Sequence, residues 1–248
     1  MEPADAPDVV VEQPPGKTWM DRFQALFEVI LLAGLISSLL ASLPFTMNEA
    51  GRESLFANVR VLSGYILLES GITFLLLFFI LKAHRETLGD FGLSWRRWRS
   101  NVIWGLAIVP VLFSLNLVIA LLFQIFFPTH FMDRNPLIDL IRTPQDLGIF
   151  VGTALIAGGI KEELQRAFIL RRFQSHLGGA GLGLVLWSTV FGLGHYVQGA
   201  QGVIAAALFG LIFGIAYLAR GSLIVPVVAH GAYDTAALLG SWFFSSPR

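Results

Sequence analysis

The sequence predicts an all-α protein that crosses a membrane about seven times around a buried polar cavity, and three observations support this fold class. Hydrophobic residues make up 55% of the 248 residues and charged residues only 14%, whereas soluble domains contain about 25% charged residues. The mean hydropathy is +0.69. Runs without charge recur at roughly 20 residues, the length at which a helix spans a bilayer. A water-soluble surface is therefore excluded.

The predicted spans follow from these charge-free runs. They are residues 29–48, 61–81, 102–127 and 147–170, two spans within 173–219, and a seventh from Leu223 onward. The fourth span is unusual because residues 147–160 alone are too short to cross a membrane. They reach the required length only if the helix continues through the charged stretch 161–166. The glycine-rich residues 198–202 divide the long uncharged run into spans five and six.

The N-terminal segment is predicted to be a disordered tail. Residues 1–15 are acidic, contain four prolines and lack the basic start of a signal peptide. The predicted organisation is a cytoplasmic tail over residues 1–20, membrane helices one to three over 21–145, and a helical core over 146–248.

The orientation is predicted from basic residues, which are retained on the cytoplasmic side in short loops. Ten lie in the N-terminal flank and in the loops after spans two, four and six, against five in the alternating loops and the C-terminus. The first set is Lys17, Arg22, Lys82, Arg85, Arg96, Arg97, Arg99, Arg171, Arg172 and Arg220. We therefore expect a cytoplasmic N-terminus in a multi-pass protein of the plasma (inner) membrane of a prokaryote.

Charge balance and cysteine content exclude several classes of protein. The 17 basic and 17 acidic residues give a formal net charge of zero, so nucleic acid is not an expected partner, whereas membrane lipid is. The chain has no cysteine, which excludes disulfides, thiolate metal sites and a cysteine nucleophile.

Ionisable residues inside the predicted spans are the candidate site, because such groups are costly in a membrane and usually functional. They are Lys161, Glu162, Glu163 and Arg166 in span four, His195 in span five, and His230 and Asp234 in span seven. A spacing of four predicts that Glu162 and Arg166 share one helix face, and that His230 and Asp234 share another.

Depths estimated from the helical rise test whether these groups can meet. Glu162, His230 and Asp234 lie about 14, 12 and 18 Å from the predicted cytoplasmic boundary. His195 lies about 7 Å further than Glu162, so tilt or distortion of span five must bring it to the others. The spacing thus predicts a site near the midplane that is reached from the cytoplasmic side.

The residue types favour hydrolysis. Glu162 with His195 would activate a water molecule for attack on an amide, and His230 would stabilise the oxyanion, without a covalent intermediate. Alternatively His195, His230, Asp234 and Glu162 would hold a divalent metal such as zinc, which lowers the pKa of bound water. The zincin pattern H-E-x-x-H is absent, so such a metal site would have to combine separate helices. The residues leave the cofactor open.

Three motifs occur in order on successive helices: E-E-x-x-R at Glu162, Glu163 and Arg166, F-x-x-x-H at Phe191 and His195, and H-x-x-x-D at His230 and Asp234. In this the chain resembles the CPBP intramembrane proteases, the family of type II CAAX prenyl endopeptidases and bacteriocin-processing or self-immunity proteins. The resemblance covers about residues 147–239.

The resemblance implies a role for each motif residue. Glu162 would be the catalytic base, His195 would help it position water, and His230 with Asp234 would line the oxyanion side. Glu163 and Arg166 would support them. The function this implies is an intramembrane endopeptidase that hydrolyses a peptide bond near the cytoplasmic leaflet, with a peptide or a lipidated protein as its substrate. The family's arginine position is occupied here by Ala167, with arginine one residue earlier. An ionised Asp234 would repel an oxyanion, so it suits a metal ligand or an orienter of His230.

Two other functions use the same residues. A proton-coupled transporter would use the buried acids and histidines as a relay, but it predicts further lining charges and an internal repeat. Glu69 in span two is the only such charge, and we interpret it as an interhelical hydrogen-bond partner or a further lining residue of the cavity. A non-catalytic immunity or scaffold member of the same fold is the third reading, and the complete set of motif residues argues against it.

Overall fold

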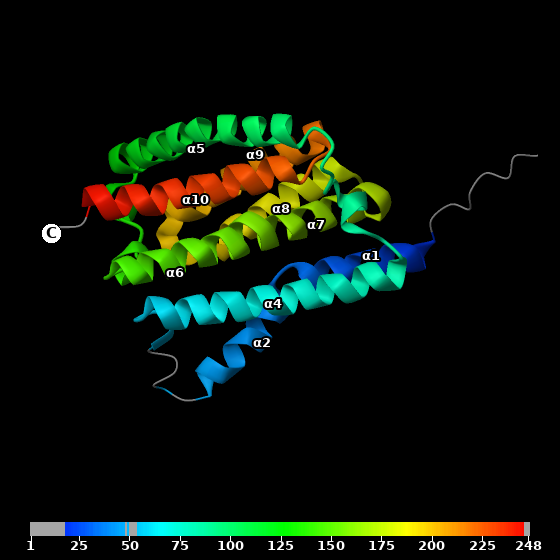
Figure 1. Ribbon diagram of the computed structural model, residues 1–248, viewed down its shortest axis with the longest axis horizontal. Coiled ribbons are helices and arrows are strands. Elements are labelled where there is room, and N and C mark those ends of the chain that lie inside the picture. The colour runs from blue at the N-terminus through cyan, green and yellow to red at the C-terminus, as the bar shows by residue number, and fades with distance from the viewer. Residues whose placement is uncertain (1–17, 48, 50–53, 246–248) are drawn as a thin grey trace, which may run out of the picture.

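The computed structural model describes residues 18–47, 49 and 54–245, and its regular elements over this part of the chain are all helical. The predicted all-α membrane fold is confirmed. The long helices lie side by side along one axis (Figure 1). They are α1 (Trp19–Leu32), α2 (Leu35–Thr46), α4 (Val59–His84), α5 (Trp98–Phe126), α6 (Pro144–Ala154), α7 (Glu163–His176), α8 (Ala180–Gly194), α9 (Gly199–Arg220) and α10 (Ile224–Ser245).

Within the described residues, four helical stretches are long and apolar enough to cross a membrane: Trp19–Thr46, Val59–His84, Trp98–Phe126 and Tyr196–Arg220. Helix α8 is apolar but shorter. The two other predicted spans correspond to α10 and to the helical stretch that runs from α6 to α7. Both carry ionisable side chains of the candidate site, which lower their hydropathy.

The first span differs from its prediction. α1 begins at Trp19, ten residues before the predicted start at residue 29, behind a capping box in which Thr18 and Asp21 bond each other's backbone. Trp19 and Met20, assigned to the tail, are therefore helical; the rest of that tail, residues 1–17, lies outside the described residues. The chain then breaks at Gly34, whose φ of 92° suits glycine, and α2 continues to Thr46. The prediction was wrong because charges near the start of α1 interrupt the apolar run.

The fourth span is one continuous helical stretch, as its length required. It starts at Thr143, which forms a capping box with Asp146, and continues through α6, the π-helix η4 (Leu155–Glu162) and α7. The sequence did not predict the π-helix, a form of helix that is frequent at functional sites. Gly158 in η4 faces α10 so closely that a Cβ there would lie 2.7 Å from Asp234 Oδ2. A side chain at this position would therefore displace the carboxylate of Asp234 from its place in the cluster.

The loops that carry most basic residues meet at one end of the bundle. Arg171 donates to the carbonyl of Asp90 at 2.6 Å, and the amide of Leu223 donates to the carbonyl of Gly92 at 3.0 Å. The short loops that were predicted to be cytoplasmic therefore share one end, on the right in Figure 1, and α10 runs toward the other. Their placement on the cytoplasmic side stays a prediction.

Candidate active site

A cavity of about 1060 Å³ lies inside the bundle, and side chains from most of the long helices line it. Four of the predicted site residues are among them: Glu162, His195, His230 and Asp234. The structure thus brings together residues from η4, from the end of α8 and from α10. Glu163 and Arg166 lie behind this lining and are fully buried.

His230 is the centre of the polar cluster. Its Nδ1 lies 2.8 Å from Glu163 Oε1, and its Nε2 lies 3.5 Å from Asp234 Oδ2 and 3.8 Å from Glu162 Oε2. The imidazole stacks on Phe213 with ring centroids 4.7 Å apart. Because a carboxylate only accepts hydrogen bonds when ionised, Glu163 holds the proton on Nδ1 and fixes the ring orientation. Nε2 is left facing the two other carboxylates.

Arg166 pairs with Glu163 rather than with Glu162. Its Nη1 contacts Glu163 Oε1, and its guanidinium lies 4.8 Å from the Phe191 ring centroid and 5.4 Å from that of Phe213. The spacing of four predicted one shared helix face for Glu162 and Arg166. In the structure Glu162 lines the cavity, whereas Arg166 lies behind it and contacts Glu163, three residues earlier in α7. The arginine reaches this glutamate although it stands one residue before the family's position at Ala167.

Glu162 is, with Asp234, one of two weakly constrained acidic groups in the cluster. Its side chain is 19% exposed, and no hydrogen bond holds it among the described residues; Lys161 Nζ at 3.9 Å and His230 Nε2 at 3.8 Å are its charged or polar neighbours. The carboxylate therefore faces the cavity with its oxygens available to water.

His195 stands just beyond the last residue of α8. Its Nδ1 donates to the carbonyl of Phe191 at 2.8 Å, and the two rings pack with centroids 4.6 Å apart. Since a carbonyl only accepts, Nδ1 carries the proton and Nε2 is free to accept a hydrogen bond in the neutral ring. The end of α8 at Gly194 supplies the distortion that the depth estimate required. No direct hydrogen bond joins His195 to Glu162 in the described part of the chain, so a water molecule would have to join them.

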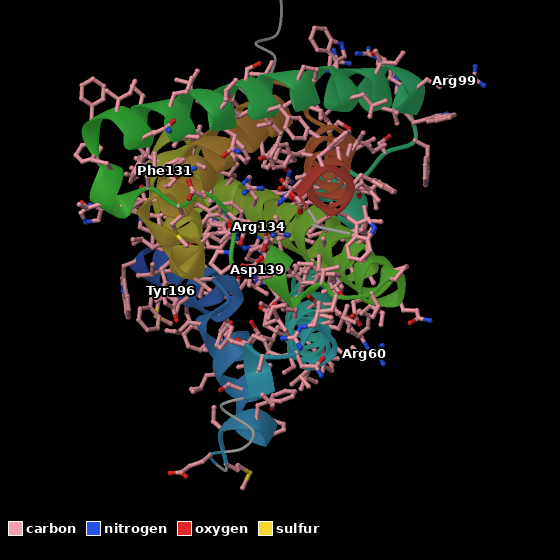
Figure 2. The ribbon with its side chains drawn as sticks, turned by 90° about the vertical axis from the view of Figure 1, so that its left-hand side faces the viewer. Arg60, Arg99, Phe131, Arg134, Asp139 and Tyr196 are labelled. Carbon is pink, nitrogen blue, oxygen red and sulfur yellow. The ribbon has the colours of Figure 1, made fainter. Side chains whose placement is uncertain are left out.

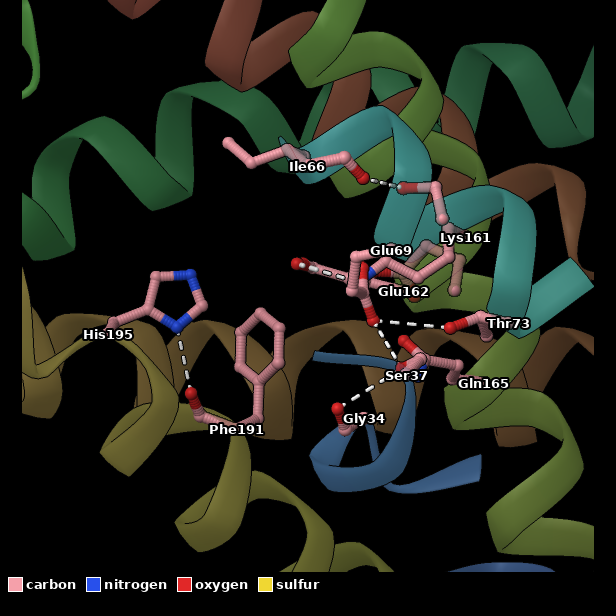
Figure 3. Close-up of polar contacts among 12 residues, drawn as sticks. Gly34, Ser37, Ile66, Glu69, Thr73, Lys161, Glu162, Gln165, Phe191 and His195 are labelled. Atoms are coloured by element: carbon pink, nitrogen blue, oxygen red, sulfur yellow. Dashed lines mark hydrogen bonds and ion pairs between the residues drawn. The ribbon is translucent and has the colours of Figure 1, made fainter. Parts of the chain in front are cut away.

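Sequence reasoning missed one ion pair at this site. Lys161 Nζ lies 2.9 Å from Glu69 Oε2 on α4, and both side chains are largely buried. Ser37 on α2 donates to Glu69 at 2.7 Å, and Thr73 donates at 3.2 Å (Figure 3). Both expectations for Glu69, an interhelical partner and a cavity-lining residue, are confirmed. The signal was present in the sequence, because Glu69 is the only acid in its span.

The cavity extends toward the end of the bundle away from the basic loops. Its lining includes most of residues 131–138, Gln201 and Ser241. Figure 2 looks onto this end and shows Arg134 and Asp139 over its middle. None of the described lining residues lies in 82–99, 171–180 or 220–223. The expectation that the site is reached from the end with the basic loops is therefore wrong.

A metal held by His195, His230, Asp234 and Glu162 stays a prediction. Among the described residues, no three His, Asp or Glu side chains are grouped so that they could hold a metal ion. Nδ1 of His230 is bonded to Glu163 and Nδ1 of His195 to a backbone carbonyl, so only Nε2 of each ring would remain to hold a metal. We assign no reaction step to a metal.

The fold and the cavity define a helical membrane protein with a buried cluster of acids, histidines and an arginine drawn from separate helices. Residues 143–236 match the family described as type II CAAX prenyl endopeptidase Rce1-like. As the resemblance predicted, this match supports a relationship to the CPBP/CAAX proteases over the C-terminal part of the chain. The comparisons with curated proteins and with solved structures found no match. The matched segment contains all six predicted site residues, and α1, α2, α4 and α5 lie outside it.

Proposed function

We propose that this protein is an intramembrane endopeptidase in which Glu162 activates water for attack on a peptide bond. The family supports a protease in general terms, and one observation carries the finer assignment. Two carboxylates of the cluster, Glu162 and Asp234, face the cavity without a hydrogen bond. Asp234 is the nearer of the two to His230 Nε2, at 3.5 Å against 3.8 Å, which leaves Glu162 as the carboxylate available to water, beside a histidine whose orientation Glu163 fixes. A general base must be free to take a proton from water, and this side chain meets that requirement.

The proposed reaction divides the work among three side chains. Glu162 takes one proton of the water, and the free Nε2 of His195 accepts a hydrogen bond from the other, which orients the attacking oxygen. Nε2 of His230, when it carries a proton, donates to the oxygen of the tetrahedral intermediate. Glu162 then returns its proton to the leaving amine. No bond forms between enzyme and substrate.

Asp234 fits the role of positioning residue. Its Oδ2 lies 3.5 Å from His230 Nε2, on the same helix one turn later. A carboxylate here would hold a proton on Nε2 in the resting enzyme and so keep this nitrogen ready to donate. The substrate oxygen would have to take the place of Asp234 at this N–H or share it, because Nε2 carries a single proton and two negative charges in contact repel each other.

The substrate we propose is an extended peptide segment, lipidated or not, that enters from the membrane. The cavity volume of about 1060 Å³ lies at the upper end of the range for small-molecule pockets, about 300 to 1,000 Å³, and so accommodates a short stretch of peptide. Because the cavity extends toward the end of the bundle that lacks the basic loops, we expect cleavage nearer that end than the cytoplasmic leaflet.

The test is a cleavage assay in liposomes on a panel of lipidated and unlipidated peptides. Replacement of Glu162 by Gln should lower turnover by about 100-fold or more, since general-base catalysis contributes roughly 10²- to 10⁴-fold. His195→Ala and His230→Ala should also lower it, whereas Asp139→Asn, an exposed acid outside the cavity lining, should not. Wild-type turnover in Glu162→Gln would refute the mechanism. Loss of activity on chelation, restored by zinc, would favour the metal alternative.

A further inference from the structure

Lys161 is a buried cation beside the proposed base, and none of the three sequence motifs includes it. Its side chain is 10% exposed, and its ammonium group lies 2.9 Å from Glu69 Oε2 and 3.9 Å from Glu162 Oε1. A lysine stem is flexible and its charge is strongly hydrated, so it stays at such a place only when a partner holds it. Glu69 is that partner.

Glu69 is itself held from two helices. Its Oε1 accepts hydrogen bonds from Ser37 on α2 and from Thr73 one turn along α4. Ser37 also donates to the carbonyl of Gly34, at the break between α1 and α2. Figure 3 shows Glu69 between these hydroxyls, with Lys161 and Glu162 next to it. The carboxylate of Glu69 therefore has a fixed position, and it fixes Lys161.

The break at Gly34 also connects to the segment that carries Glu162. Gln165 Nε2 donates to the carbonyl of Leu32 at 2.7 Å, near the end of α1. A Cβ at Gly34 would lie 3.8 Å from Gln165 Nε2 and 3.9 Å from Glu69 Oε1, which is ordinary contact. The bend between α1 and α2 thus lies directly against the polar residues of α4 and of the α7 start.

Two groups lie near the carboxylate of Glu162, one beside each of its oxygens. Lys161 lies nearest Oε1, and His230 Nε2 lies nearest Oε2. With no hydrogen bond to hold it, the carboxylate is oriented by these two groups. Removal of the lysine would leave His230 as the only positive or donating neighbour and would let the carboxylate turn toward it, away from the water.

We propose that Lys161 is a positioning residue for Glu162 and that Glu69 positions Lys161. This inference rests on the proposed function, because it assigns Lys161 a role only if Glu162 is the base. It places part of the catalytic arrangement on α2 and α4, outside the segment that matches the protease family.

The test compares four variants by steady-state cleavage in liposomes. Lys161→Met should lower kcat by about 10- to 100-fold at nearly constant KM, because a small misplacement of a reacting group costs that much. Lys161→Arg should retain most of the activity, and Glu69→Gln should fall between them. Arg60→Met is the matched control: it breaks the ion pair of Arg60 with Asp146, 3.1 Å long, which also joins α4 to the helical stretch that carries Glu162, and should leave kcat unchanged.

A charge exchange separates positioning from simple helix attachment. The double variant Glu69→Lys, Lys161→Glu restores an ion pair between α4 and η4, so thermal unfolding should return toward that of the wild type. It also puts a carboxylate beside Glu162, so kcat should stay low. Recovery of kcat by the exchange, or wild-type kcat in folded Lys161→Met, would overturn the inference. If Lys161→Met does not fold, Glu69→Gln and the exchange decide the question by the same readouts.

Failure of this inference is distinguishable from failure of the proposed function. An inactive Glu162→Gln with fully active Lys161→Met would reject the role of Lys161 alone. An active Glu162→Gln would reject the base itself.

Discussion

The N-terminal helix α5 and the C-terminal helix α7 differ in what their side chains contact. In α5 only 17% of the most apolar window is buried, and residues such as Ile103 face outward at 66% exposure. In α7, by contrast, a continuous row from Ala167 to Leu170 is almost completely buried. The outer helices meet lipid, whereas α7 lies inside the protein, and this explains how a helix with so many charges exists within a membrane.

The polar residues of the N-terminal helices occur where they meet the C-terminal ones. Glu28 on α1 accepts from Arg172 on α7 at 2.7 Å, and Glu69 on α4 pairs with Lys161. Each buried acid of the outer helices thus compensates a buried cation of the inner ones, as expected for charges in a medium that cannot solvate them. Ion pairs therefore join the N-terminal helices to the C-terminal ones, although only the C-terminal helices carry the family motifs.

The largest expected effect on stability is at the buried ion pair between Arg166 and Glu163. Arg166→Met leaves the fully buried Glu163 with His230 as its remaining partner, and the loss of the arginine should cost about 3 to 5 kcal/mol of unfolding free energy. The double variant Glu163→Gln, Arg166→Met should recover part of the loss, because a neutral amide needs no counter-charge. Denaturant unfolding in detergent measures both. A single variant as stable as the wild type would show that this pair does not hold the core.

The ion pair between Arg172 on α7 and Glu28 on α1 provides the contrast. In Arg172→Met the freed Glu28 keeps its contact with His84 at 2.5 Å, and Glu86 reaches water. The loss of stability should therefore be smaller than for Arg166→Met. Turnover per folded molecule should not change, because Arg172 lies outside the cavity lining. A larger loss than in Arg166→Met would contradict this distinction between the regions.

The smallest perturbation tests from which side the cavity is reached. The chain has no cysteine, so single cysteine variants can be labelled without background. Asn135→Cys lies in the cavity lining, and Ser94→Cys lies in a basic loop. With an impermeant maleimide on intact cells, Asn135→Cys should react and Ser94→Cys should not. Labelling of Ser94→Cys but not of Asn135→Cys would contradict the orientation that the basic residues predict.

Much of this architecture was predictable because it depends on composition and spacing. The continuation of span four beyond residue 160 followed from the length of a membrane helix, and the need to distort span five at His195 followed from helical rise. The six site residues followed from their unusual place in apolar runs. Each of these inferences needs only the bilayer thickness and helix geometry.

The rest depends on contacts between distant segments. No residue pattern revealed the π-helix η4, and spacing alone did not decide whether Arg166 contacts Glu163, three positions before it, or Glu162, four positions before it. The start of α1 at Trp19 was hidden because Glu28 is neutralised by Arg172, which is far away in sequence. The pair of Glu69 and Lys161 requires α4 and η4 to be adjacent, and local pattern does not determine that.

The central claim is that Glu162 activates water and forms no bond with the substrate. Cleavage under single-turnover conditions in water enriched in oxygen-18 tests it directly, with mass spectrometry of the product and of the enzyme peptide that contains Glu162. We expect the label in the new carboxyl terminus of the product and none in Glu162. Label in the side chain of Glu162 would reveal an acyl-enzyme intermediate and would contradict the account.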